Sequence, residues 1–342
     1  MNQVTHRSTR MKRRTTVGLL LDFWVASDFP SKIHVDGFVV RRVTNKYKKL
    51  LQGALKDHLS HEDKQRWEGC RYALFHSYVP ASTTLEEEEK DLQPFHRFTQ
   101  LLRIIRPNTV ICDVMGYDGK LPQEKSIRRY LSDPRRMHPA DHAATDSIFT
   151  LQDARKIKKY HRVYSHSAAT TEYDRLATAF YFFETQFHSP TPRIKVVGIV
   201  AALEALFNTS NGETAFKIAI RCASFLGRSS AERYEIFRNV KSIYDLRSKV
   251  AHGQPLSNGI YKNPKVGVNL IILAESYVRK CLAKIIEEDY TDVFGKKQSD
   301  LEAAFDRFVL GVDRKLGRPK LVQSSLTAAS AAHTDSRSPS SP

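Results

Sequence analysis

The second half of the sequence is the part that most restricts what this chain can fold into. From Thr171 onwards, apolar residues recur every three or four positions in successive segments, which proline, glycine and Asn-Gly signals separate. This spacing places the apolar residues of each segment on one face of an α-helix. The sequence therefore predicts five amphipathic helices, over residues 172–188, 192–207, 214–226, 230–251 and 266–288.

Local signals mark the ends of these helices. Thr191 followed by Pro192 is the usual order of an N-cap and a first helical residue. Ser230 is the predicted cap of the fourth helix, and Gly227 ends the third. Helices joined by short connections pack as an antiparallel bundle. We therefore predict an all-α domain over residues 166–295.

The first 165 residues mix short β-like runs with helical ones. Runs rich in apolar and β-branched residues predict strands over 15–26, 32–43, 71–79 and 109–115, with a turn at Asp36-Gly37. Helical spacing of apolar residues predicts helices over 46–59 and 85–105. The stretch 116–144 is rich in Pro, Asp and Arg, which predicts a loop.

The predicted fold class is therefore an α+β N-terminal domain, residues 1–165, followed by the all-α antiparallel helical bundle. Residues 296–342 form a C-terminal extension in this prediction. After about residue 322 the extension is Ser, Ala, Thr and Pro with almost no apolar bulk, so disorder is predicted there.

The charge balance favours a polyanionic partner. Lys and Arg number 54 against 37 Asp and Glu, which gives a net charge of +17 and a pI near 9.7. Nucleic acid is the first candidate for such a partner, and a solvated surface is the alternative. The basic arm from Arg7 to Arg14 could bind RNA phosphates, or it could be an unstructured tail.

The composition also bears on compartment and on metals. Four separated cysteines without a CxxC pair favour a reducing, cytoplasmic location. No apolar run approaches the roughly 20 residues that span a bilayer, and Asp22 interrupts the signal-like N-terminal run. His138 and His142 have zinc-like spacing but no nearby partners, so we predict neither a metal nor a cofactor.

The predicted fourth helix carries an arginine on its apolar stripe. The stripe runs through Ile236, Val240 and Ile243 and reaches Arg247 at the same spacing. A guanidinium on a packing seam needs a carboxylate, an exposed cleft or a second subunit, because burying it unpaired is costly. The sequence thus predicts a partner for Arg247.

His252 follows Arg247 by five positions, at the end of the same helix. On an unbroken helix that separation corresponds to about 140°. Gly253 and Pro255 predict a break that lets His252 fold back toward Arg247. An imidazole can move protons near neutral pH, and a guanidinium can hold charge that develops on phosphate, so the pair suits phosphodiester chemistry.

Two stretches resemble the signature segments of HEPN domains, most closely the Apea-like branch: ALEALF at 202–207 and IYDLRSKVAHG at 243–253. A KIAIR run at 217–221 and the last predicted helix fall where that family has them. The resemblance covers about 120 residues and includes the family's Arg-x4-His motif, as Arg247 and His252.

The resemblance implies a metal-independent ribonuclease that works as a homodimer, with two motifs forming one composite site. The RNA 2′-hydroxyl attacks the adjacent phosphate and leaves a cyclic phosphate and a 5′-hydroxyl. Arg247 would stabilise the transition state and His252 would transfer the proton. Ser248 would contact phosphate or orient His252, and Glu204 would pair with Arg247. Members of this branch are often bacterial anti-phage (abortive-infection) or stress proteins that cleave tRNA or other RNA.

Several alternatives stay open at this point. Arg247 and Glu204 could form only a buried structural ion pair, and the module could be a non-catalytic scaffold or an RNA- or nucleotide-binding module. Lys217, Arg221 and Lys249 are candidate RNA contacts, although a solvated face is the alternative for the first two. The homodimer is predicted to form through the second and fourth helices, around Val240, Ile243 and Val250.

Overall fold

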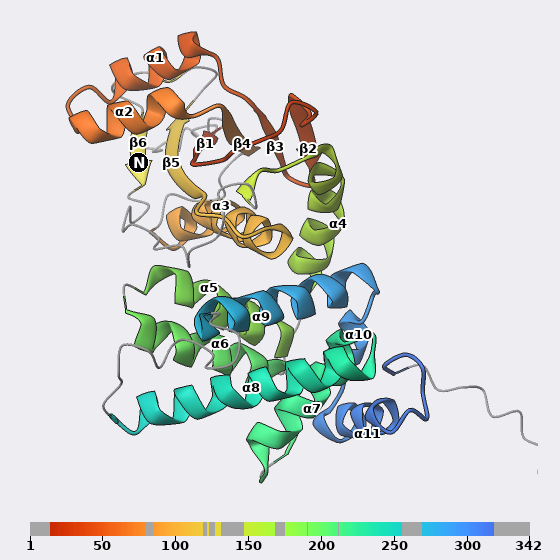
Figure 1. Ribbon diagram of the computed structural model, residues 1–342. Coiled ribbons are helices and arrows are strands. Elements are labelled where there is room, and N and C mark those ends of the chain that lie inside the picture. The colour runs from red at the N-terminus through yellow and green to blue at the C-terminus, as the bar shows by residue number, and fades with distance from the viewer. Residues whose placement is uncertain are drawn as a thin grey trace, which may run out of the picture.

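The computed structural model describes residues 14–78, 85–118, 122, 127–130, 147–167, 175–189, 191–210, 212–254 and 269–317. Within them, a sheet with flanking helices is followed by an all-helical part, as Figure 1 shows. This order agrees with the coarse fold class predicted from the sequence. We call the first part, β1 to α4, the sheet domain and the second, α5 to α11, the helical domain.

The sheet has six strands in the order β2-β3-β4-β1-β5-β6, and every neighbouring pair is antiparallel. The predicted turn at Asp36-Gly37 joins β2 to β3, and Gly37 takes the positive φ of 87° that such turns require. The strands are β1 (Arg14–Leu21), β2 (Lys32–Val35), β3 (Phe38–Arg42), β4 (Tyr72–Tyr78), β5 (Ile111–Asp118) and β6 (Ile127–Tyr130).

Helices cover both faces of this sheet. On one face, α1 (Asn45–Ala54) and α2 (His61–Gly69) contribute Leu51 and Trp67 to a core with β1. On the other face lie α3 (Leu85–Ile105) and α4 (Leu151–Ser167), and α3 separates the sheet from the helical domain (Figure 1). The central strand β1 is therefore buried on both sides.

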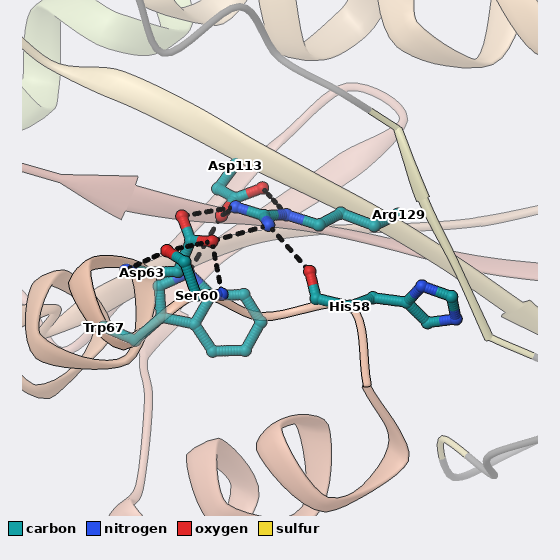
Figure 2. A network of polar contacts seen from close by, with 6 residues as sticks. All are labelled: His58, Ser60, Asp63, Trp67, Asp113 and Arg129. Atoms are coloured by element: carbon teal, nitrogen blue, oxygen red, sulfur yellow. Dashed lines mark hydrogen bonds and ion pairs between the residues drawn. The ribbon is translucent and has the colours of Figure 1, made fainter. Parts of the chain in front are cut away.

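A network of polar contacts joins α2 to strands β5 and β6 of the sheet (Figure 2). The Arg129 guanidinium on β6 donates to both oxygens of Asp63 on α2, at 2.9 and 2.8 Å, and to Asp113 on β5, at 2.8 and 3.2 Å. The Trp67 indole also donates to Asp113, at 2.8 Å. The hydrogen bonds from Arg129 lower the pKa of Asp63 and keep it ionised. Each carboxylate is thus satisfied internally, so we assign the network a structural role.

The helical domain begins at residue 175 among the described residues. Its elements are α5 (Arg175–Thr185), the 3-10 turn η2 (Gln186–His188), α6 (Pro192–Phe207), α7 (Thr214–Leu226), α8 (Ser230–Ala251), α9 (Leu270–Glu287), α10 (Thr291–Phe294) and α11 (Gln298–Val309). The predicted bounds of α6, α7 and α8 are confirmed, with Ser229 rather than Ser230 as the cap of α8. No helix in the described ranges is long and apolar enough to cross a membrane.

The helical core extends further than predicted. Leu301 and Phe305 on α11, and Leu316 after it, are fully buried in the same core as α6 and α9. The helical domain extends beyond the end predicted near residue 295, because residues before and after that position pack into one core. The residues after 317, the arm before residue 14, and His138 and His142 lie outside the described residues.

Three elements of the sheet domain were not predicted from the sequence: α2, α4 and β6. Only Trp67 of α2 is buried, so α2 has no apolar stripe that a pattern could reveal. β6 falls in the stretch predicted as loop, and it pairs with β5 through a segment, Ile-Arg-Arg-Tyr, without apolar alternation. The strand predicted over 15–26 stops at Leu21, since Asp22 takes a φ of 57°.

We expect Gly18→Ala to destabilise the fold. A Cβ at Gly18, in the middle of β1, would lie 2.6 Å from the Phe95 ring of α3 and closer still to the Cys112 sulfur. Overpacking of this kind costs about 1–3 kcal/mol of the free energy of unfolding. Urea unfolding measures this cost, and Gly53→Ala in α1, where nothing lies within 4 Å, is the control expected to cost nothing. Equal stabilities of the two variants would contradict this packing.

Candidate active site

The C-terminal end of α8 holds both residues of the predicted motif, and it lies at the end of the helical domain away from α10 and α11 (Figure 1). The helix ends in a Schellman motif, in which Gly253 takes the left-handed conformation at a φ of 65°. The Gly253 amide donates to the Val250 carbonyl at 3.1 Å, and the Gln254 amide donates to the Lys249 carbonyl at 2.9 Å. The chain therefore reverses at Gly253.

His252 does not fold back toward Arg247, and that prediction is wrong. His252 is the C-cap, with a φ of −88° and a ψ of 10°, and its amide still bonds to the Ser248 carbonyl. Because the reversal comes one residue later, the His252 side chain leaves the helix about 140° around the axis from Arg247. His252 is exposed to solvent.

Arg247 lies near the end of the packing seam of α8 and is partly exposed there. Leu246 is 3% exposed, whereas the Arg247 side chain is 34% exposed. At 100° per residue, Arg247 lies within about 20° of Ile236 and Val240 around the helix axis. The guanidinium therefore follows the apolar stripe but is not enclosed by the core.

The predicted partner of Arg247 is present. The Arg247 Nη2 lies 3.9 Å from the Glu204 Oε1 on α6, and the Glu204 side chain is 27% exposed. This ion pair is too long for a hydrogen bond and too exposed for the buried pair considered as an alternative. It leaves the guanidinium free to accept a second anion while Glu204 restricts its position.

Tyr244 is a third member of this site that sequence reasoning missed. Its hydroxyl donates to the Glu204 Oε1 at 2.9 Å, and the Arg247 guanidinium carbon lies 5.8 Å from the centre of its ring. Partial burial, and after it the Glu204 carboxylate, raises the pKa of Tyr244. Its position three residues before Arg247 was the available signal, because that spacing places both side chains on one side of a helix.

Two predicted RNA contacts do not belong to this site. Arg221 is 3% exposed and donates to the Phe207 carbonyl and the Thr209 hydroxyl, both at 2.8 Å. Lys217 donates to the Ser210 hydroxyl at 2.8 Å. Arg221 is thus a structural residue beneath α11, and its predicted exposure is wrong. The other two predicted residues on α8 stay near the site, with Ser248 half-buried and Lys249 exposed.

Most of the apolar flank predicted to form the dimer interface is buried in the core of the same chain. Val240 and Ile243 are 1% and 2% exposed and belong to the helical core. Two exposed apolar residues lie on α6, the helix that carries Glu204: Ile194 is 59% exposed and Val197 is 37% exposed. Ile194, Val197, Ala201 and Glu204 follow one another at helical spacing, so this stripe leads to the Arg247 partner.

Comparisons of the chain with protein-family models, with curated proteins and with solved structures found no match. Among the described residues, no three or more His, Cys, Asp and Glu side chains gather where they could hold a metal ion. The site itself offers a partly exposed guanidinium held by a carboxylate, and an exposed imidazole at the same helix end.

We expect Glu204→Gln to lower the pKa of Tyr244 toward its ordinary value. The negative carboxylate disfavours the phenolate, so removing the charge removes that part of the upward shift. Labelling tyrosine with ¹³C at the ring carbon next to the hydroxyl, with Tyr244→Phe for assignment, measures the titration by NMR. Asp245→Asn, which removes an exposed negative charge one residue from Tyr244, is the control. An unchanged titration in Glu204→Gln would show that the two side chains do not meet.

Proposed function

We propose that this chain is an endoribonuclease that cleaves RNA without a metal ion, with Arg247 and His252 as its catalytic residues. The observation that carries the proposal is that a half-exposed arginine, positioned by Glu204, shares a helix end with an exposed histidine. The net charge of +17 and the resemblance of residues 202–207 and 243–253 to HEPN signature segments support it.

In the proposed reaction, the RNA 2′-hydroxyl gives its proton to the His252 imidazole, and its oxygen attacks the adjacent phosphorus. The bond from phosphorus to the 5′-oxygen breaks, and that oxygen takes up a proton from water as it leaves. The products are a 2′,3′-cyclic phosphate and a 5′-hydroxyl. Arg247 stabilises the negative charge that grows on the phosphate oxygens, and Glu204 with Tyr244 positions Arg247. The Ser248 hydroxyl, on the next residue, is available to a phosphate oxygen.

The site is composite in this proposal, and a second copy of the chain completes it. Within one chain, Arg247 and His252 diverge by about 140°, which favours a phosphate bound between Arg247 of one copy and His252 of another. The α6 stripe of Ile194 and Val197 is the apolar surface that such a homodimer would cover. The dimer thus uses α6 and the end of α8, without the buried Val240 and Ile243.

The same divergence favours a second candidate function, a non-catalytic RNA-binding or scaffold module, because a single chain does not bring the two residues together. From the resemblance to the Apea-like branch, we propose that the enzyme is a bacterial defence or stress ribonuclease, with tRNA as one substrate. The two experiments below separate the enzyme from the binding module.

The first experiment concerns the chemistry. We expect the purified chain to cut RNA in EDTA, and Arg247→Ala and His252→Ala each to slow cutting by about 100-fold or more. Because the Arg247–Glu204 pair is loose and half-exposed, Arg247→Ala should lower the free energy of unfolding by less than about 1 kcal/mol. Gel electrophoresis, end-group analysis for the cyclic phosphate and urea unfolding measure these effects.

Lys280→Ala, at an exposed position on α9 that belongs to neither the site nor the α8 surface, is the control and should change the rate far less. Cutting that survives both the Arg247 and His252 substitutions, or that stops in EDTA, would contradict the assignment. An inactive wild-type chain that binds RNA would favour the binding module.

The second experiment concerns assembly. A mixture of Arg247→Ala and His252→Ala chains should recover activity, since a mixed dimer joins the intact Arg247 of one copy to the intact His252 of the other. With random mixing, about a quarter of the wild-type rate is expected. Sedimentation verifies the dimer, and Val197→Asp on the α6 stripe should dissociate it and abolish the recovery. A mixture as inactive as its components would mean that the two residues act within one chain.

A further inference from the structure

The face of α8 that points away from the core carries aromatic and cationic side chains along its length. Tyr234, Lys241, Ser248 and His252 lie along one line on this face, within about 40° of one another around the axis at 100° per residue. His252 follows Tyr234 by 18 residues, or about five full turns. The line therefore ends at the proposed proton-transfer residue. We call it, together with Phe237, Arg238 and Tyr244 beside it, the α8 stripe.

Each ring of the α8 stripe has a cation next to it. The Arg238 guanidinium carbon lies 5.8 Å from the centre of the Tyr234 ring, and the Lys241 Nζ lies 5.8 Å from that of Phe237. The third ring is Tyr244, beside Arg247 at the same distance. Phe216 of α7 adds a fourth ring, which meets Phe237 edge to face with centres 5.7 Å apart.

Two of these rings are open to solvent. Tyr234 is 64% exposed and Phe216 is 46% exposed, so most of one ring and nearly half of the other remain uncovered. Between the stripe and the start of α7 lies a hollow of about 500 Å³, lined by residues 213–216, Lys241 and Tyr244. A hollow of this size, with a ring on each side and a lysine at its edge, is within the range of small-ligand sites.

The charge of the stripe is that of a surface for anions. Arg238, Lys241 and Lys249 are exposed on or beside it, whereas Asp245 is the acidic residue of α8 on this face and Glu213 lies at the hollow. Cations that alternate with exposed rings are what a single-stranded nucleic acid requires, because bases stack on rings and phosphates meet cations. In a duplex the bases stack on one another, so their faces are not accessible to the aromatic rings of the protein.

We propose that the α8 stripe binds single-stranded RNA, with bases stacked on Tyr234 and Phe216 and phosphates beside Arg238 and Lys241. From Tyr234 to His252 the helix rises about 27 Å, so the stripe spans several nucleotides. The strand runs along α8 toward the His252 end. The binding stands on the stripe itself, and only the description of the strand as a substrate rests on the proposed function.

The test measures the affinity of the full chain, in the His252→Ala background that prevents cutting, for a fluorescent 12-nucleotide adenosine RNA. Tyr234→Ala combined with Phe216→Ala should weaken binding by about 30-fold or more, as loss of stacking of two bases does. The matched control is Tyr181→Ala on α5, since Tyr181 is 65% exposed and Tyr234 is 64% exposed. Tyr234→Phe, which keeps the ring, should bind as the parent does.

Two further ligands separate stacking from charge. The ring variants should bind inorganic polyphosphate, which has no bases, as tightly as the parent. Arg238→Ala with Lys241→Ala should weaken both ligands and reduce the salt dependence of RNA binding. A base-paired RNA of the same length should bind less tightly than the single strand and should not respond to the ring substitutions.

Ring variants that bind the adenosine RNA as tightly as Tyr181→Ala would overturn the proposal and leave the stripe as a surface for a protein partner. If the wild-type chain binds RNA through the stripe but never cuts it, the proposed function fails and the stripe stands. If it cuts RNA and the ring variants bind normally, the stripe fails and the proposed function stands.

Discussion

The buried ion pair between Arg103 on α3 and Glu184 on α5 is the interaction on which the arrangement of the two domains depends. Arg103 is 1% exposed, and its guanidinium also donates to the Val110 carbonyl at 3.0 Å. Its own carbonyl accepts from the Arg279 guanidinium of α9 at 2.7 Å. Burial acts to raise the pKa of Glu184, but Arg103 and His188 together outweigh it and the pKa is lowered. Losing either partner would strand a buried charge, at a cost of about 3–5 kcal/mol.

The helix that carries Arg103, α3, contributes to two cores at once. Phe95 and Phe98 of α3 face the sheet, whereas Leu101 and Ile104 face the helical domain. The helix therefore fixes α9, and α9 in turn fixes α8 through packing and through the Asn239 amide, which donates to the Tyr277 hydroxyl at 2.9 Å. Because α8 is held from its core side, its other face and its C-terminal end remain open. The proposed catalytic residues and the α8 stripe lie there.

The buried Arg103–Glu184 pair and the Arg247–Glu204 pair of the candidate site differ in burial. Arg103 is enclosed and its charge is matched within the chain, so it is committed to structure. Arg247 is half-exposed and only loosely paired, so it keeps the capacity to bind another anion. The Tyr244 hydroxyl holds Glu204 in place without occupying the guanidinium. The sequence pointed to Glu204 as the Arg247 partner because the two residues lie in the two segments that resemble HEPN signatures. It did not point to Tyr244, because a tyrosine on a helix suggests only packing.

The sequence by itself determined α6, α7 and α8, their bounds and the location of the Arg247–His252 motif at a helix end, because caps, glycines and apolar spacing act within a few residues. Only the tertiary structure decided which residues are buried. Leu246 is buried whereas Arg247, the next residue, is partly exposed, and Arg221 is enclosed because α11, some 80 residues later, covers it. The direction of His252 depended on a turn one residue beyond it. Burial and side-chain direction depend on distant neighbours, which no local pattern encodes.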